Sequence, residues 1–325
     1  MSSLIPWGLK HWQARILERE PQAAMHSSAM LGRVIGLHRQ SIDLMTEQGL
    51  ISVQPRTGHQ ARGARLAVGD WILLGKDSTQ VASIEDVLPR TSILSRRASG
   101  PRHEIQELGA NLDQVFVLSA MDRTFSAARI ERFLVACWLN RIQPVLILTR
   151  RDQVASIDPF LSELTDVLID TPVIALNALS PAAIIALKPF LRPGQTTTLL
   201  GTSGAGKSSL TNTLAGEEVM ATQSVRAFDD KGRHTTTRRQ LIQLPENRGL
   251  LIDSPGVREM QIWHDQVSEE ASFKHLHLEA ALCKFSDCQH ETEHSCAVKI
   301  RAAQDHVFAL LLRKYQAVRR VISKH

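Results

Sequence analysis

A run of nine residues has the side-chain types and spacing needed to bind phosphate. Residues 201–208 fit the pattern G-x-x-x-x-G-K-[ST], and the run is Gly201, Thr202, Ser203, Gly204, Ala205, Gly206, Lys207, Ser208 and Ser209. Glycines let the backbone wrap around an anion, and the N–H groups of the loop and of the following helix start point at phosphate. We expect Lys207 to neutralise the β- and γ-phosphates and Ser208 to place its hydroxyl on Mg²⁺. The run therefore predicts a nucleoside triphosphate site.

The residues around this run favour that interpretation over a glycine-rich turn that matches by chance. Residues 196–200 predict a short buried strand, and residues 208–215 predict the start of a helix. The motif binds phosphate when it stands between a strand and a helix.

Two segments downstream are candidates for the magnesium and γ-phosphate side of the site. An apolar strand ends in the D-x-P-G sequence of residues 253–256, where Asp253 would hold the Mg²⁺ water shell and the Gly256 N–H would reach the γ-phosphate. The threonine-rich residues 230–237 suit a switch loop, in which Thr236 or Thr237 would complete Mg²⁺ coordination. Each segment alone is also compatible with an ordinary polar turn.

A base-recognition segment precedes the phosphate loop. An apolar strand at residues 146–148 runs into Thr149, Arg150, Arg151 and Asp152. A carboxylate at this position accepts two hydrogen bonds from guanine, from N1–H and from the 2-amino group. Adenine does not offer that pair of donors, so Asp152 predicts a preference for guanine.

Three of the four cysteines cluster with a histidine near the C-terminus. Cys283, Cys288, His290 and Cys296 form a Cys₃His set, which is typical of a closed, structural zinc site. Scattered thiols beside a surface histidine are the alternative, and His294 is a possible substitute ligand. A catalytic metal is disfavoured because four protein ligands leave no open position. The fourth cysteine, Cys137, falls on the apolar stripe of a predicted helix and is interpreted as a core residue.

Composition and charge limit the class of protein. The chain has 325 residues, 43% of them hydrophobic and 22% charged, which predicts two or three soluble domains. No signal-peptide pattern and no membrane-spanning run is present, so we expect a cytoplasmic protein. The net charge of +5 permits a polyanionic partner. Beyond residue 298 only Asp305 opposes seven cations, which indicates either RNA contact or a solvated helix face; they are Lys299, Arg301, Arg313, Lys314, Arg319, Arg320 and Lys324.

The pattern along the chain predicts a multidomain fold. Residues 1–30 form an extension, and residues 31–98 form an OB-like β-barrel with short strands near 31–36, 42–45, 68–74 and 80–84. Residues 99–262 form an α/β domain, with 96–112 of linker composition, strands at 115–118, 144–148 and 173–175, and helices at 127–140, 159–169 and 181–190. Residues 263–325 form a zinc-binding α-helical domain that ends in one helix over 298–322.

The order of the motifs resembles one particular family. Base recognition comes first, followed by the phosphate loop, the switch and D-x-P-G, which is a circular permutation of the usual GTPase order. With the preceding barrel, the markers at 68–71, 110–113 and 232–237 and the zinc segment, essentially the whole chain resembles the RsgA (YjeQ) family of circularly permuted GTPases in small ribosomal subunit biogenesis.

The resemblance implies a function and a set of partners. It implies a central circularly permuted P-loop GTPase domain that hydrolyses GTP to GDP, with Mg²⁺ at the nucleotide and one Zn²⁺ per chain on the Cys₃His set. It implies that a monomeric protein binds the 30S subunit and its 16S rRNA during late maturation and that the subunit stimulates its GTP hydrolysis. Val257 stands where many GTPases carry a water-orienting glutamine, and the resemblance implies that His234 is the catalytic residue instead.

The base-recognition segment departs from the family pattern. Thr149 replaces an asparagine that ties the phosphate loop to the base loop, and Arg150 replaces a lysine whose stem lies over the base. We expect guanine preference to persist with lower affinity, and a diverged second paralogue is one interpretation. Two other functions compete: an ATP-dependent kinase or ATPase, which Asp152 disfavours, and a non-catalytic RNA-binding protein, which the intact phosphate loop and Asp253 disfavour.

Overall fold

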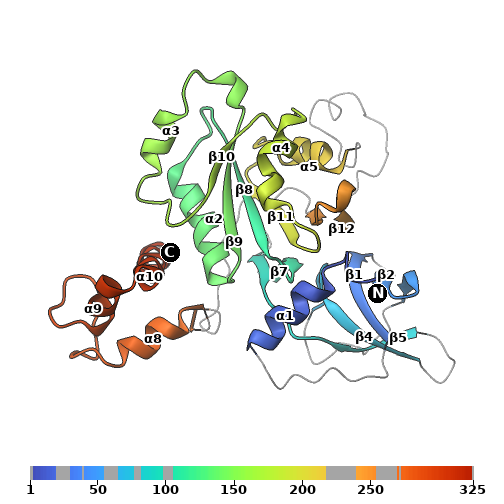
Figure 1. Cartoon of the computed structure of the whole chain (residues 1–325), viewed down its shortest axis with the longest axis horizontal. Coiled ribbons are helices and arrows are strands. Elements are labelled where there is room, and N and C mark those ends of the chain that lie inside the picture. The colour runs from blue at the N-terminus through green and yellow to red at the C-terminus, as the bar shows by residue number, and fades with distance from the viewer. Residues whose placement is uncertain are drawn as a thin grey trace.

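The fold has three parts that follow one another along the chain. The computed structural model describes residues 3–19, 30–38, 40–54, 65–76, 82–97, 105–216, 239–253, 269–270 and 272–323. A β-rich N-terminal part, a central α/β part and a C-terminal group of helices occupy separate regions of the molecule (Figure 1). In these described ranges no helix is both long and apolar enough to cross a membrane.

The N-terminal part consists of one helix and a five-stranded antiparallel ladder in the order β3-β2-β1-β4-β5. The elements are α1 (Leu9–Arg19), β1 (Met30–Leu37), β2 (Ile42–Thr46), β3 (Gly49–Val53), β4 (Trp71–Lys76) and β5 (Ala82–Val87). The helix packs on the ladder through Trp12 and Trp71, whose ring centroids lie 5.7 Å apart. Among the strands of this ladder, β3 was not covered by any predicted segment. Its Leu50 is 63% exposed, so the strand is not buried along its whole length and gives only a weak apolar pattern.

A hairpin lies where the sequence predicted a linker. Strands β6 (Ile93–Arg97) and β7 (Ile105–Ala110) pair antiparallel, so the linker prediction for residues 96–112 is wrong for these strands. Their inward side chains Leu94 and Leu108 are buried, whereas the polar residues between them conceal the strand pattern. The hairpin thus connects the N-terminal ladder to the central sheet.

The central part is a parallel sheet with helices on both faces. Its strands β10-β9-β8-β11-β13 run parallel, and β12 pairs antiparallel with β13. The elements are β8 (Gln114–Ala120), α2 (Ala127–Leu139), β9 (Gln143–Thr149), α3 (Asp158–Glu163), β10 (Val173–Ala175), α4 (Ala182–Leu187), β11 (Thr196–Gly201), α5 (Lys207–Ala215), β12 (Gln240–Gln243) and β13 (Leu250–Asp253). The predicted strands and helices are present, although α3 ends well before the predicted residue 169.

The alternation of side chains along β8 divides the core into two layers. Val115 and Val117 join the cluster on the α2 side, and Phe116 and Leu118 join the cluster beneath α4 and α5. Every residue of β8 is buried, which is expected of a parallel strand covered on both faces. This central strand lies beside β11, so it supports the strand that leads into the phosphate loop.

The sheet continues from the central part into the N-terminal ladder. Strand β12 pairs antiparallel with β1 at Gln240 and Gly36, which joins the two parts into one eleven-stranded sheet. Buried Arg33 of β1 also donates a 2.8 Å hydrogen bond to Thr196 Oγ1 at the start of β11. The N-terminal ladder therefore contacts the base of the phosphate-loop strand.

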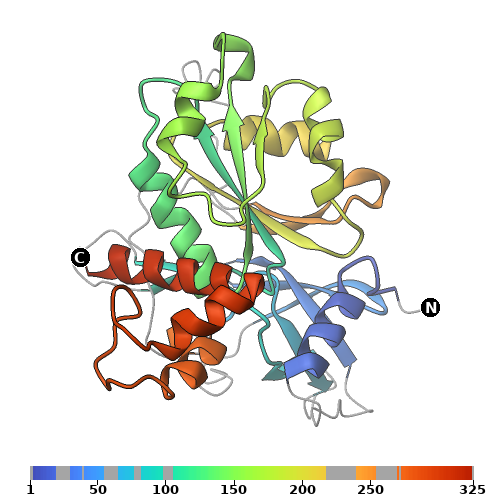
Figure 2. The ribbon, with the colours of Figure 1, turned by 60° about the vertical axis from the view of Figure 1, so that its left-hand side comes forward.

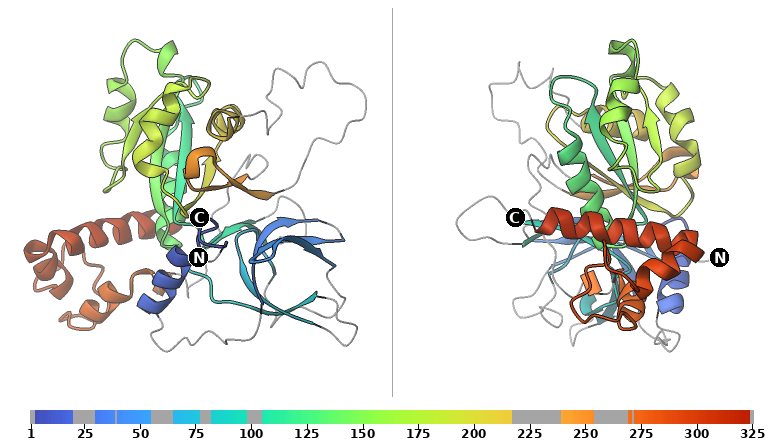
Figure 3. Two further views of the ribbon diagram at one scale, coloured as in Figure 1. Left: turned by 45° about the vertical axis from the view of Figure 1, so that its right-hand side comes forward. Right: turned by 90° about the vertical axis from the view of Figure 1, so that its left-hand side faces the viewer.

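The C-terminal part contains α8 (Lys274–Ala280), α9 (Ala297–Gln304) and α10 (His306–Ile322). The prediction of one helix over 298–322 is wrong, because the helix is interrupted at Asp305. Its carboxylate accepts hydrogen bonds from the backbone N–H groups of Val307 (2.9 Å) and Phe308 (3.1 Å), which caps a new helix. Figures 2 and 3 show α10 crossing α2, and Arg320 of α10 pairs with Glu131 of α2 at 2.6 Å.

Candidate nucleotide and metal sites

The phosphate loop connects β11 to α5 in a backbone conformation that requires glycine. Gly206 has φ 91°, in the left-handed region, immediately before the helix begins at Lys207. At Gly201 a Cβ would come within 2.4 Å of the Leu118 carbonyl oxygen, so a side chain there would separate β11 from β8. The loop thus stands at the carboxyl end of a central parallel strand, where α/β sheets bind ligands.

Lys207 folds back over the loop that precedes it. Its Nζ donates to the backbone carbonyls of Gly201 (2.7 Å) and Thr202 (2.6 Å). Burial lowers the pKa of the Lys207 ammonium to about 8. Phosphate oxygens beside Nζ would favour the charged form and reverse that effect. The ammonium is therefore held at the position where a triphosphate would bind.

Thr149 joins the predicted base-recognition segment to the phosphate loop. Its hydroxyl lies 2.9 Å from the carbonyl oxygen of Ala205 and 3.4 Å from that of Ser119. A hydroxyl carries a single proton, so the shorter contact, to Ala205, is the main hydrogen bond. The side chain is buried, and it packs against Gly206. Threonine therefore supplies a link between the two loops despite the absence of the family's asparagine.

Arg150 makes a second link to the same loop. Its Nη2 donates to the Gly204 carbonyl at 3.2 Å, and its Nη1 pairs with Asp122 Oδ2 at 2.6 Å. Burial acts to raise the pKa of Asp122, but hydrogen bonds from Thr124 and the charges of Arg150 and Arg123 outweigh it and lower that pKa. Sequence reasoning missed Asp122, although a carboxylate directly after the buried strand β8 was a signal for it.

Asp152 lies on a short 3-10 helix, Arg151–Gln153, that follows β9. Its side chain is exposed. The segment is anchored to the turn after β10, because Arg151 N–H donates to the Leu176 carbonyl at 3.2 Å. Thr213 of α5 in turn donates to the Ala178 carbonyl at 2.8 Å. The two loops that follow β9 and β10 and the helix after the phosphate loop thus gather at one edge of the sheet.

Asp253 ends β13 at this same edge. Strand β13 runs parallel to β11, with Ile252 opposite Thr198, so Asp253 lies beside the strand that leads into the phosphate loop. Burial raises the pKa of Asp253 to about 6, and a nearby divalent cation would favour the ionised carboxylate. The other predicted members of this side of the site lie outside the described residues: His234, Thr236, Thr237 and Gly256.

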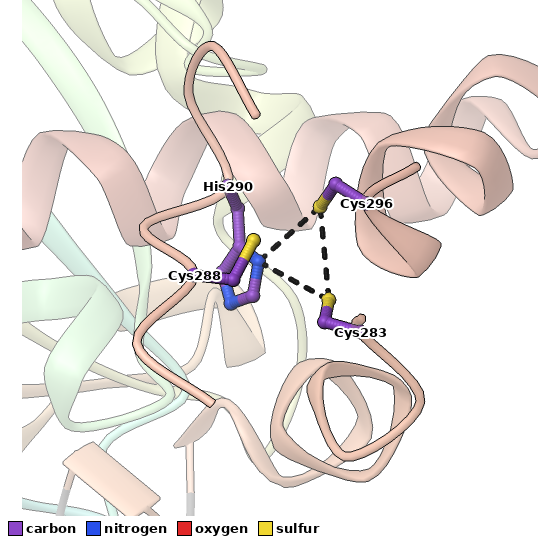
Figure 4. A group of neighbouring side chains, drawn as sticks. All are labelled: Cys283, Cys288, His290 and Cys296. Carbon is purple, nitrogen blue, oxygen red and sulfur yellow. Dashed lines mark hydrogen bonds between the residues drawn. The ribbon is translucent and has the colours of Figure 1, made fainter. Parts of the chain in front are cut away.

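The four predicted metal ligands converge on one point (Figure 4). One ligand atom from each of Cys283, Cys288, His290 and Cys296 lies within 4.8 Å of the others. Cys283 and Cys296 Sγ are 3.8 Å apart, and His290 Nδ1 is 3.7 Å and 3.3 Å from them. Tetrahedral zinc, with Zn–S of about 2.3 Å and Zn–N of about 2.0 Å, requires separations of roughly 3.8 Å and 3.5 Å. The ligand set therefore fits a tetrahedral metal, with Nδ1 as the histidine donor.

Neighbouring groups stabilise this arrangement. Burial acts to raise the pKa of the Cys283 thiol, but backbone N–H groups of Val298 and Ala297 at the start of α9 outweigh it and lower that pKa. The His290 carbonyl accepts a 3.0 Å hydrogen bond from Gln316 of α10. Such contacts to the ligands orient them around a metal. Cys137, in contrast, is fully buried in α2, and burial raises the pKa of its thiol, as expected for a core residue.

Several of the cationic side chains near the C-terminus form ion pairs with acidic residues of the same chain. Lys314 pairs with Asp170 at 3.3 Å, and Arg301 pairs with Glu279 at 2.8 Å. Together with the Arg320–Glu131 pair, these contacts hold the helices to one another and to the central part. These three helix charges thus have a structural use within the chain, which neither the RNA-contact nor the solvated-face interpretation included.

The fold and the site define a class of protein. A chain whose predicted base-recognition segment precedes the phosphate loop and is hydrogen-bonded to it has the arrangement of a circularly permuted P-loop nucleotide hydrolase. A model of the RsgA GTPase family matches residues 87–263. The chain belongs to this family of GTPases.

Similar proteins extend the match over most of the chain. The small ribosomal subunit biogenesis GTPase RsgA 2 of Lactiplantibacillus plantarum is 37% identical over 299 residues, covering 90% of this chain and 84% of the relative. RsgA of Xanthomonas oryzae pv. oryzae is 39% identical, covering 87% and 78%. Among solved structures, YjeQ of Thermotoga maritima has a TM-score of 0.59 at 23% identity, covering 90% and 98%, and YloQ, described as a circularly permuted GTPase, has 0.57 at 20%, covering 93% and 99%. These two likenesses show the fold.

Proposed function

We propose that this GTPase acts in late maturation of the 30S ribosomal subunit. It binds the subunit through its 16S rRNA, the subunit stimulates GTP hydrolysis, and hydrolysis releases or resets the protein. The observation that carries the proposal is the match to relatives named small ribosomal subunit biogenesis GTPases over 84% and 78% of their length. Two of the relatives, from Lactiplantibacillus plantarum and Vibrio vulnificus, are named RsgA 2, in keeping with a second-paralogue hypothesis.

The residues of the phosphate loop and the base segment would hold the nucleotide. Backbone N–H groups of residues 201–209 and the Lys207 ammonium bind the β- and γ-phosphates. The Asp152 carboxylate accepts the two guanine donors, and Thr149 and Arg150 keep its segment at a fixed distance from the phosphate loop. The exposure of Asp152 and the contacts to Ala205 and Gly204 support these roles.

A second group of residues would act at the γ-phosphate. Ser208, Asp253 and one of Thr236 and Thr237 hold Mg²⁺, directly or through its water shell, and Gly256 donates its N–H to the γ-phosphate. Bound Mg²⁺ neutralises charge on the β- and γ-oxygens. His234 orients the attacking water once the subunit orders the switch, because the apolar Val257 has no group that binds water. The position of Asp253 beside β11 supports its part in this arrangement.

The flanking domains would direct the GTPase to RNA. Residues 31–98 form an OB-type domain that touches rRNA, residues 99–262 form the GTPase domain, and residues 263–325 form a domain held together by one Zn²⁺ on Cys283, Cys288, His290 and Cys296. The sulfur and nitrogen separations support zinc. The protein works as a monomer in the cytoplasm.

One experiment separates this function from its rivals. GTP turnover is measured while purified 30S subunits are titrated into the protein, with Lys207→Ala as the inactive control. We expect slow turnover alone and a large rise with subunits. Equal competition of ATP and GTP for binding would favour the ATPase alternative, and absent turnover with intact 30S binding would favour a vestigial nucleotide site.

A further inference from the structure

Arg239 is a partly buried cation with no hydrogen-bond or ion-pair partner among the described residues. It stands immediately before β12, and its Nε is shielded from solvent and has no hydrogen-bond partner. No ion pair joins it to any residue in the described part of the chain. A buried guanidinium without an acceptor costs free energy, and proteins normally pair such a charge. Arg239 Nε therefore lacks an acceptor among the residues that the structure describes.

A second arginine, Arg96, lies on the β6–β7 hairpin, and its charge acts on Arg239. The hairpin packs on the β12–β13 pair, since Ile252 Cδ1 of β13 lies only 2.9 Å from where a Cβ on Gly109 of β7 would be. Arg96 of β6 uses its Nε on Gln106 Oε1 at 2.9 Å, which leaves its outer nitrogens for a ligand. Burial and the charge of Arg96 both lower the pKa of Arg239, consistent with two close cations.

The charges around the pair leave a net positive site. Among the described residues, Glu107 of β7 is the acidic group whose charge acts to raise the pKa of Arg239, against the effect of Arg96. The charge of Glu107 also acts to raise the pKa of Arg90. The guanidinium of Arg90, however, is bound to the buried Asp70 carboxylate, with Nε and Nη2 each donating to one oxygen at 2.7 Å. Within the described residues, two arginines and one carboxylate leave a charge of about +1 (two cations less one anion), which suits a single anionic group.

We propose that Arg96 and Arg239 bind one backbone phosphate of RNA at the junction of the N-terminal ladder and the GTPase sheet. A phosphodiester offers two charged oxygens, one for each guanidinium fork. Partial exposure of both residues lets a surface strand of RNA reach the site. The identity of the RNA as 16S rRNA rests on the proposed function. Figure 1 shows β7 at this junction, so the contact would touch both parts at once.

The test uses the full-length protein and two probes. Binding to purified 30S subunits and to deproteinised 16S rRNA is measured over a series of KCl concentrations for the wild type, R96Q, R239Q and the double variant. We expect the double variant to bind about tenfold more weakly, the loss typical of a charge-assisted hydrogen bond. The slope of log K against log[KCl] should become shallower by about 0.7–0.9, the value for one phosphate contact.

Matched controls separate binding from folding. R192Q makes the same charge change at exposed Arg192, far from the site in the sequence, and should leave the slope unchanged. R239Q removes an unpartnered charge, so its Tm should stay equal to or above that of the wild type, and basal GTP turnover should be unaffected. A lowered Tm would instead assign Arg239 a purely structural role and overturn the proposal.

Three further outcomes would overturn it. These are an unchanged salt slope in the double variant, an equal loss in R192Q, and a loss with 30S subunits but none with 16S rRNA, which would assign the anion to a ribosomal protein. If the wild type fails to bind 30S subunits, the proposed function fails, whereas the 16S rRNA measurement still decides the arginine site.

Discussion

The hydroxyl of Thr149 donates a 2.9 Å hydrogen bond to the backbone carbonyl of Ala205, across 56 residues of chain. This bond connects the end of β9, which precedes the base-recognition residues, to the middle of the phosphate loop. A nucleotide that contacts both segments needs them at a fixed separation, so the bond organises the site before the ligand arrives.

Replacing Thr149 with valine should weaken nucleotide binding. Valine has nearly the same shape, but it leaves the Ala205 carbonyl without its donor, at a cost of about 1–3 kcal/mol. We expect the Kd for a fluorescent GDP analogue to rise by about 5- to 150-fold while the fold is retained. Thr165→Val, at an exposed hydroxyl that bonds only to its own turn, is the control. Equal affinity of Thr149→Val and the wild type would show that the link is dispensable.

The Asp122–Arg150 pair should matter less and should depend on salt. Both side chains are partly exposed, at 22% and 40%, and such pairs contribute about 0–1 kcal/mol. We expect Asp122→Asn to raise the GDP Kd by no more than about fivefold at low salt, with the difference fading as KCl is added. A double-mutant cycle with Arg150→Gln measures the coupling, which should be close to zero at high salt. A salt-independent loss would contradict an electrostatic role.

Nucleotide affinity should fall as pH rises above about 8. In the protein without nucleotide, burial lowers the pKa of Lys207 to about 8, and bound phosphates would raise it again. Binding therefore takes up a proton at higher pH, where the free protein has lost it. Calorimetric titration with GDP in buffers of different ionisation enthalpy should show this uptake above pH 8. Lys207→Met should abolish the uptake, and a pH-independent affinity in the wild type would contradict the assignment.

The same lowered pKa has a consequence for stability without nucleotide. The unfolded chain keeps its lysine proton up to the ordinary pKa near 10.5, whereas the folded protein releases it near pH 8. Burial of the charged form costs stability below pH 8, and the cost diminishes as pH rises from about 8 toward 10.5. Relative to Lys207→Met, the wild type should gain stability over that window in urea unfolding.

Loss of one metal ligand should loosen the C-terminal helices. The metal would hold the loops before α9, and His290 is bonded to Gln316 of α10. We expect Cys296→Ser to lose the single zinc, measured by elemental analysis, and to make residues beyond 270 sensitive to protease. Cys137→Ser, which changes a thiol in the α2 core, should retain one zinc per chain. Full metal content in Cys296→Ser would exclude it as a ligand.

His234→Ala should reduce hydrolysis and leave binding intact. A residue that orients water acts on the chemical step, and such groups contribute about 10²- to 10⁴-fold. We therefore expect subunit-stimulated kcat to fall by about 100-fold or more with an unchanged Kd for GTP. Thr235→Ala, next to it in the switch, is a neighbour control. Retention of stimulated turnover in His234→Ala would assign the water-orienting role to another residue.

The sequence alone predicted the features that depend on short runs of residues. The glycine positions of the phosphate loop, the strand before it and the helix after it follow from local backbone preference and apolar periodicity. The spacing of Cys283, Cys288, His290 and Cys296 likewise predicted the ligand cluster, because closely spaced ligands need little help from distant segments. The order of the motifs indicated the permuted GTPase.

The tertiary structure alone decided the contacts between distant segments. Sequence did not predict that β6 pairs with β7, that β12 pairs with β1, or that Arg150 binds Asp122. It also missed the break at Asp305, where a capping carboxylate outweighs a continuous helical pattern. The charge of Arg96 acts on Arg239, 143 positions later in the sequence, because the β6–β7 hairpin packs on the central sheet. Such contacts depend on which surfaces bury each other, and no local pattern carries that information.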